Sequence, residues 1–240
     1  MDLARIGQKA EHDFAGAKCG LLDQISSLFG REHELVMTDF RTMEISHVRL
    51  PEDVCLLMCD TGTKHSLVES EYNERRINCE KAAKQLSGLL DRPVRSLRDV
   101  NSAELESVRT GLNEVTVRRA AHVTGENDRV LRSRGYLNSG EVEKFGELMF
   151  ESHESSRVNF ENSCRELDFL VEKAAGIPGI LGARLSGGGF GGSMVALTRV
   201  RDADTARHAL ASAFEKEFGR SCPSMAVVPS PGAALCDNSD

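Results

Sequence analysis

The sequence predicts a protein of the α+β class, and three observations support this. Strand-like segments fill residues 34–60, helical periodicity dominates residues 69–175, and residues 180–228 read as strand, strand, helix and strand. We expect the last group to form one compact layer, because a hairpin, a crossover helix and a returning strand can share an apolar face.

Two short helices are expected at the start of the chain. Residues 2–12 have polar, helix-forming composition up to Gly16. Beyond it, apolar side chains at positions 21, 22, 25, 28 and 29 form a stripe of helical period that ends at Gly30. A glycine after the last apolar residue is a common helix end, so this second helix should be short.

Three strands are expected next. Residues 34–38 and 44–50 have the pattern of a hairpin, and the apolar run Val54–Cys59 should be a more deeply buried strand. The sequence Thr61-Gly62-Thr63 indicates a turn after it.

The middle of the chain is expected to be helical until Gly176 and Pro178 end it. The expected helices cover residues 69–90, 101–110, 114–134, 139–150 with a continuation, and 164–175. The closing layer is expected to consist of strands at 180–185 and 193–200, a helix at 202–218 and a strand at 225–228.

Composition excludes several classes of protein. The 240 residues include 30 basic and 37 acidic side chains, for a net charge of −7, so no nucleic-acid partner is expected. The longest apolar run is about one strand long, and the N-terminus has no apolar core of a signal peptide, so no membrane partner is expected. Seven scattered cysteines without a CxxC pair, and histidines without an HExxH pattern, predict a reduced, cytoplasmic protein without a dedicated metal site.

The most informative stretch is residues 182–193, with the sequence Gly-Ala-Arg-Leu-Ser-Gly-Gly-Gly-Phe-Gly-Gly-Ser. So many glycines permit positive φ angles and close approach to a ligand, and successive amides there could form an anion-binding nest. Gly187, Gly189 and Gly192 match GxGxxG, but the following residues are strand-like, whereas a dinucleotide fingerprint needs a helix there. A glycine-rich hairpin that serves only as a turn is the alternative.

Two other segments are ambiguous when taken alone. Residues 19–24, Cys-Gly-Leu-Leu-Asp-Gln, place an acid early in a helix, where it could serve only the helix dipole. Residues 65–76 lie at a junction between strand and helix, where Ser66 or Ser70 could cap the helix ahead of a solvated charged face.

Together, these segments resemble the galactokinase branch of the GHMP small-molecule kinases. Ser-Gly-Gly-Gly-Phe-Gly-Gly (186–192) resembles the third signature motif of that superfamily, residues 19–24 resemble the loop with the catalytic aspartate, and Ser-Glu-Tyr-Asn-Glu-Arg-Arg (70–76) resembles its SEYxxRR helix. The resemblance extends from about residue 3 to Cys236. Three more stretches support it: 118–126, 152–157 and 163–168.

The resemblance implies a transferase of galactose and carbohydrate metabolism that moves the ATP γ-phosphoryl group to the anomeric hydroxyl of galactose. Asp23 would accept or orient the hydroxyl proton, Gly20 would let the backbone approach the sugar, and Tyr72 would contact a ring substituent. ATP and Mg²⁺ are the implied cofactors. The implied nucleotide-side residues are Ser186, Gly187, Gly188, Gly189, Gly191 and Gly192. Structural pairing alone is expected for Arg157, Arg129 and Glu126.

The resemblance also implies a fold of the GHMP-kinase type. Residues 1–62 would be the remainder of an N-terminal domain, and residues 63–240 a C-terminal α/β sandwich with ferredoxin-like elements. The family's GRVNLIGEHTDY and PxxxGLSSSA motifs do not occur in the sequence. We therefore expect the C-terminal part of a galactokinase, inactive alone because phosphoryl transfer depends on positioning and charge neutralisation.

Several alternatives stay open. The chain could be one piece of a split kinase whose partner is a separate N-terminal piece. It could be a non-catalytic sugar- or nucleotide-binding regulatory protein of the same fold, or a truncated product without a function of its own. N-acetylgalactosamine is an alternative sugar, because kinases for it share these motifs.

Overall fold

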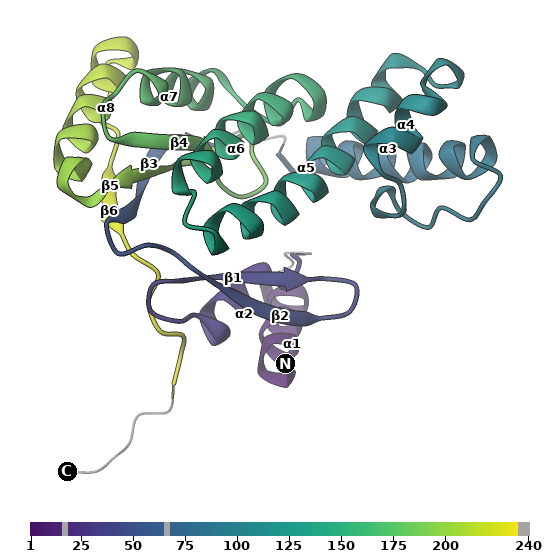
Figure 1. Cartoon of the computed structure of the whole chain (residues 1–240), viewed down its shortest axis with the longest axis horizontal. Helices are drawn as coiled ribbons and strands as arrows, with labels where there is room; N and C mark the ends of the chain where they lie inside the picture. The colour runs from purple at the N-terminus through teal and green to yellow at the C-terminus, as the bar shows by residue number, and fades with distance from the viewer. Residues whose placement is uncertain (16–18, 65–67, 235–240) are drawn as a thin grey trace. The chain divides into compact units, whose positions relative to one another are not determined.

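The computed structural model describes residues 1–15, 19–64 and 68–234, and the chain divides into two compact units. Unit 1 comprises Met1–Glu52 and Val228–Asp240, and unit 2 comprises Asp53–Val227 (Figure 1). Within the described residues, no helix combines the length and apolar character needed to cross a bilayer.

Unit 1 contains two helices and a hairpin. Helix α1 (Asp2–Ala10) continues into a π-helical turn, and α2 (Leu22–Phe29) follows. Strands β1 (Glu34–Asp39) and β2 (Glu44–Arg49) pair antiparallel, with Leu35 opposite Val48. The two expected helices and the expected hairpin are confirmed. The apolar stripe of α2 is only partly covered, because Ile25 is fully buried whereas Leu22 is exposed.

The C-terminal segment returns to unit 1 and lies along the end of α2. The amides of Gly232 and Ala233 donate to the carbonyls of Gly30 and Ser27, at 2.8 and 2.7 Å. A Cβ at Gly30 would lie 2.8 Å from the Ser230 carbonyl oxygen. Glycine is therefore needed there for close backbone packing as well as for ending the helix.

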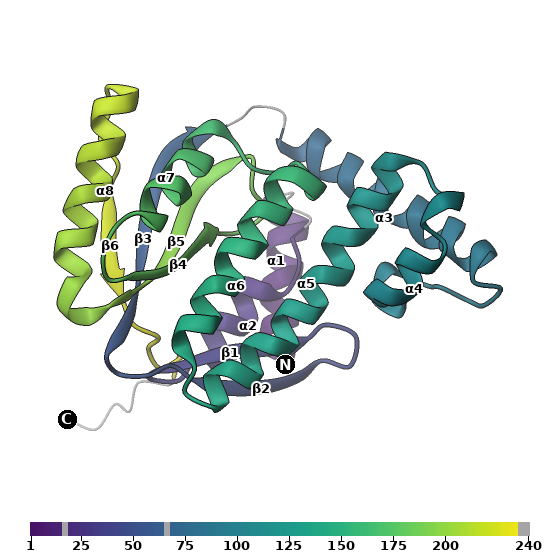
Figure 2. The ribbon, with the colours of Figure 1, turned by 45° about the horizontal axis from the view of Figure 1, so that its top comes forward.

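Unit 2 is organised around a four-stranded antiparallel sheet of order β4-β5-β3-β6. Its core lies between this sheet and the helices α7 and α8, while α6 packs on β4 (Figure 2). The strands are β3 (Val54–Lys64), β4 (Ile180–Leu185), β5 (Gly191–Arg199) and β6 (Ser224–Val227). The helices are α6 (Val142–Ser155), α7 (Arg165–Ala175) and α8 (Ala203–Phe218).

Strand β3 is a central strand of this sheet. It pairs with β5 on one side and with β6 on the other, so the hairpin β4-β5 and the returning strand β6 do not meet directly. Leu57 and Cys59 of β3 are fully buried, which confirms the expected deep burial. The assignment of residues 1–62 and 63–240 to two family domains stays a prediction.

The turn expected at residues 61–63 is wrong, because β3 continues through it to Lys64. Gly62 has a φ of +64°, and the pairing with β5 shifts register between Asp60 and Lys64. A glycine at positive φ inside a strand allows an irregularity of this kind, so the same residue that indicates a turn instead marks a bulge.

The remaining helices of unit 2 surround a second apolar cluster. Leu86 of α3 and Ala120 of α5 are fully buried in it. Asn101 and Asn113 cap α4 and α5 by accepting from the amides of Glu104 and Thr116, both at 2.9 Å. These helices are α3 (Val68–Leu89), α4 (Ser102–Ser107) and α5 (Glu114–Asn138), and all three were expected from periodicity.

Candidate functional site

Asp23 lies in the first turn of α2 in unit 1, where its side chain is exposed. Its carboxylate forms no hydrogen bond or ion pair with another described residue. Gly20 is also exposed, and no described atom lies within 4 Å of the position of an added Cβ. Packing among the described residues therefore does not demand a glycine there.

The loop before Asp23 is fastened to the N-terminal helical segment. The carbonyl of Cys19 accepts hydrogen bonds from Gln8 Nε2 at 3.1 Å and from His12 Nε2 at 3.0 Å. Gln24 packs beside Gly7, whose Cβ would lie 3.2 Å from Gln24 Cγ. These polar contacts attach Cys19 to α1 and to the π-helical turn.

Tyr72 belongs to α3, but its side chain lies outside the described residues, so its predicted sugar contact stays a prediction. One helical turn later, Arg75 has a clear environment. Its Nε donates to the Phe160 carbonyl at 2.7 Å and its Nη2 to the Glu161 carbonyl at 3.0 Å. Its guanidinium also lies over the Phe190 ring, 5.6 Å from the centroid.

The glycine-rich loop joins β4 to β5, and the Ser186 amide closes it by donating to the Ser193 carbonyl at 2.8 Å. The expected use of positive φ is confirmed at Gly187, Gly189, Gly191 and Gly192, with values of +77°, +85°, +131° and +78°. Phe190 also has a positive φ, of +58°. A hairpin of ordinary turn chemistry does not need so many left-handed residues in a row.

One part of this loop is packed and the other is open. A Cβ at Gly189 would lie 2.0 Å from the Asn162 carbonyl oxygen, and a Cβ at Gly191 would lie 2.4 Å from the Thr63 carbonyl oxygen. At Gly187 and Gly188, no described atom lies within 4 Å of such a Cβ. The described residues therefore leave the space beside these two residues open, and ligand contacts to Ser186 and the glycines stay a prediction.

Two of the family-like stretches, 152–157 and 163–168, contact each other next to Leu185, where the glycine loop begins. The Leu185 amide donates to His153 Nδ1 at 3.2 Å, so the ring proton resides on Nε2, which donates to Asp168 Oδ1 at 3.1 Å. Ser163 Oγ donates to the same oxygen at 2.6 Å. Burial by itself raises the pKa of Asp168, but the hydrogen bonds from His153 and Ser163 outweigh it and lower the pKa overall.

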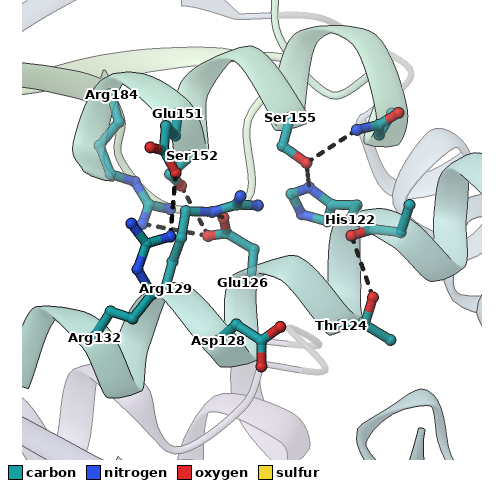
Figure 3. Close-up of polar contacts among 12 residues, drawn as sticks. His122, Thr124, Glu126, Asp128, Arg129, Arg132, Glu151, Ser152, Ser155 and Arg184 are labelled. Atoms are coloured by element: carbon teal, nitrogen blue, oxygen red, sulfur yellow. Dashed lines mark hydrogen bonds and ion pairs between the residues drawn. The ribbon is translucent and has the colours of Figure 1, made fainter. Parts of the chain in front are cut away.

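A second polar cluster centres on Glu126 of α5 (Figure 3). Arg129 Nε and Ser152 Oγ donate to its carboxylate at 2.6 and 2.8 Å, and Arg184 Nη1 lies 3.6 Å from it. Burial raises the pKa of Glu126, but Arg184, Ser152 and Arg129 outweigh it and hold the pKa below its usual range. Structural pairing was expected for Arg129 and for Glu126, and the structure pairs them with each other.

His122 lies beside that cluster. Its Nδ1 is 3.0 Å from Ser155 Oγ, and its ring stacks on Phe160 with centroids 4.4 Å apart. Burial lowers the pKa of His122 to about 4, so the imidazole is neutral near pH 7. The expected pairing role of Arg157 is also confirmed, because its Nη2 contacts Glu154 at 2.8 Å.

Among the residues that the structure describes, no group of three or more His, Cys, Asp or Glu side chains could hold a metal ion. The described residues thus hold no preformed cage of three or more protein ligands, whereas the Mg²⁺ that the resemblance implies is usually bound by one or two carboxylates together with substrate phosphates and waters.

Comparisons with known proteins agree with the fold and the motifs. The family model for the C-terminal part of GHMP kinases matches residues 133–216. A galactokinase from Mannheimia succiniciproducens is 40% identical over 98% of this chain and 60% of its own length. One from Thermotoga petrophila is 39% identical over 91% of this chain and 60% of its own length. The crystal structure of Lactococcus lactis galactokinase complexed with galactose matches with a TM-score of 0.85 and 31% identity, over 96% of this chain and 59% of that one.

The chain therefore has the fold of the GHMP kinase class, and its residues 133–216 match the C-terminal part of those kinases. Within that class the chain is a homologue of the galactokinases, at about 40% identity over 98% of its residues. It spans about 60% of the length of the galactokinases that it matches.

Proposed function

We propose that this chain provides the proton-accepting aspartate, the sugar-side helix and the glycine loop of a galactokinase. The observation that carries the proposal is its 40% identity to a galactokinase along 98% of its residues, with all three segments inside the matched part. The reaction would transfer the γ-phosphoryl group of ATP to the anomeric hydroxyl of galactose. Cytoplasmic location belongs to the same proposal.

In this proposal, Asp23 accepts the proton of the anomeric hydroxyl while the hydroxyl oxygen attacks the γ-phosphorus. The bond to the bridging oxygen breaks at the same centre, and ADP leaves with that oxygen. The exposed Asp23 carboxylate supports the role, because no other described side chain occupies its oxygens. Gly20 would let the backbone approach the sugar, and the Tyr72 hydroxyl would contact a ring substituent.

The glycine loop would lie on the nucleotide side. Gly187 and Gly189 have positive φ whereas Gly188 between them does not, and such alternation can point successive amides to one side in a nest that favours anions. The space beside Gly187 and Gly188 supports contact of their backbone with a phosphate group, because no described atom lies within 4 Å of a Cβ built at either residue. Amides fixed before the reaction stabilise phosphate charge without reorganising.

We propose that turnover also needs the part of a galactokinase that this chain does not span. Phosphoryl transfer is mostly positioning and charge stabilisation, and the described residues of this chain offer no carboxylate cluster for a metal. A polypeptide equivalent to the remaining 40% or so of the Mannheimia succiniciproducens relative would complete the site.

The test compares this chain alone, mixed with, and fused to that remaining segment of the Mannheimia succiniciproducens galactokinase. ADP release is measured with galactose and, separately, with N-acetylgalactosamine. We expect sugar-dependent turnover only in the completed protein, and its loss in Asp23→Asn but not in Glu32→Gln, which alters another exposed acid of unit 1.

Two results would contradict the proposal. An inert completed protein with both sugars excludes the kinase function, and sugar or nucleotide binding by calorimetry without turnover would then favour the regulatory alternative. Full activity in Asp23→Asn would instead exclude the assigned role of the aspartate while leaving the reaction class intact.

A further inference from the structure

A short turn at residues 160–162 connects the sugar-side helix α3 to the glycine loop. Arg75 of α3 donates to the carbonyls of Phe160 and Glu161, at 2.7 and 3.0 Å. The next residue, Asn162, contacts the glycine loop directly. All these residues belong to unit 2.

Asn162 holds the loop at two points. Its Nδ2 donates to the Gly188 carbonyl at 3.0 Å, and its own carbonyl accepts from the Phe190 amide at 2.6 Å. Between these bonds lies Gly189, whose missing Cβ leaves room for the Asn162 backbone. Asn162 is only 6% exposed, so water does not compete strongly for these bonds.

Arg75 adds a third point of attachment. Its guanidinium lies over the Phe190 ring while its nitrogens are bonded to the 160–162 turn, and its side chain is only 12% exposed. A planar guanidinium can stack and donate at the same time, which an ammonium cannot do with the same geometry. Arg75 therefore contacts both the 160–162 turn and Phe190 of the glycine loop.

The turn itself is held in a conformation that needs support. Glu161 is left-handed, with φ +54° and ψ +46°, which is uncommon for a residue other than glycine. Arg118 Nη2 lies 3.1 Å from one oxygen of its carboxylate, and Arg119 pairs with the other. The Asn162 amide donates to the Ser156 carbonyl at 3.2 Å. The turn is thus a fixed support rather than a free connection.

From this geometry we infer that Arg75 and Asn162 are positioning residues that fix the direction of the open amides at Gly187 and Gly188. The inference rests on the proposed function, in which these amides face the nucleotide. Five of the seven residues 186–192 are glycines, so the loop by itself has many accessible conformations. Contacts from residues outside the loop must therefore hold it in the conformation that binds the nucleotide. Tyr72 lies one turn before Arg75, so the same clamp links the sugar-side helix to the nucleotide side.

The first test uses the chain as it is and needs no activity. Hydrogen exchange of the peptide covering residues 186–192 is compared between wild type, Asn162→Asp and Arg75→Lys. Asn162→Asp keeps the shape but loses the donor to Gly188, and Arg75→Lys keeps the charge but loses the planar stack. We expect exchange at the Phe190 amide to rise by about fivefold or more, the effect of one ordinary hydrogen bond. The controls Asn138→Ala and Arg76→Lys, both at exposed positions, should match wild type.

The second test uses the completed galactokinase. We expect the KM for ATP to rise by about fivefold or more in both variants, while the KM for galactose changes by less than about twofold. Residues that only support the fold would change both constants or the yield of folded protein.

Unchanged exchange and unchanged KM for ATP in both variants would overturn the inference. If a thermal melt shows that one variant does not fold, the exchange and the KM for ATP of the other variant decide whether the inference holds. If the completed wild type is inactive while exchange still rises in the variants, the clamp stands and the proposed kinase function falls, so the two failures are distinguishable.

Discussion

Replacing Gly189 by alanine should destabilise unit 2 more than the same replacement at Gly187 or Gly188. Gly189 has a φ of +85°, and its Cβ would lie 2.0 Å from the Asn162 carbonyl oxygen and 2.8 Å from Asn162 Nδ2. Gly187 has a similar φ of +77° but nothing within 4 Å of its Cβ. Gly188 has neither a positive φ nor a close neighbour.

The three positions therefore separate two costs. A left-handed alanine costs roughly 1–2 kcal/mol relative to glycine, which Gly187→Ala and Gly189→Ala share. Overpacking against a fixed backbone adds about 1–3 kcal/mol, which only Gly189→Ala incurs. We expect Gly188→Ala to lie near wild type, because it incurs neither cost.

Urea unfolding followed by circular dichroism measures these differences as changes in the free energy of unfolding. The expected order of destabilisation is Gly189→Ala, then Gly187→Ala, then Gly188→Ala. Equal stability of Gly189→Ala and Gly187→Ala would show that the Asn162 backbone yields without cost, and the argument for a tight clamp would fail with it.

Two other predictions concern the polar cluster of α5 and α6. Glu126→Gln should cost about 1.5–3 kcal/mol of unfolding free energy, because Arg129 and Arg184 lose the charged partner that they share. Glu154→Gln, in the exposed pair with Arg157, should cost at most about 1 kcal/mol. Similar losses in both variants would contradict this assignment. Burial lowers the pKa of His122 from 6.5 in the unfolded chain to about 4, so its contribution to stability is fully present above pH 6.5 and is lost as the pH falls toward 4. The urea midpoint of wild type should fall more over this range than that of His122→Gln, and parallel pH profiles would argue against a buried neutral histidine.

Local sequence patterns were sufficient for most secondary elements. The helical periodicity of residues 114–134 predicted α5, and the apolar run Val54–Cys59 predicted a buried strand. They were insufficient for the pairing of that strand, because β-propensity and alternation do not encode which strand is the neighbour. The glycine at position 62 was misleading for a related reason, since positive φ serves a turn and a bulge equally well.

The candidate site was predictable only in part. The glycine loop was visible because a dense run of glycines is costly without a use, and the positive φ angles expected there are confirmed, while its use stays a prediction. Arg75 lay inside the family-like stretch 70–76, so the motif pointed to this residue. The sequence did not indicate which residues it would contact. Asn162 lay between two such stretches and offered none, because its contacts with Gly188 and Phe190 are made across 26 and 28 positions of sequence.

The sequence alone determined the α+β class, the order of helices and strands, and the motifs that mark a galactokinase homologue, because each of these depends on residues close together in the chain. Only the tertiary structure decided that β3 lies between β5 and β6, and that the turn at residues 160–162 holds the glycine loop through Asn162. It also decided that Gly146 and Gly182 let α6 and β4 touch, since a Cβ at Gly182 would lie 2.1 Å from the Gly146 carbonyl oxygen. Such contacts depend on the packing of distant segments, and that packing is set by the shape and burial of the whole unit.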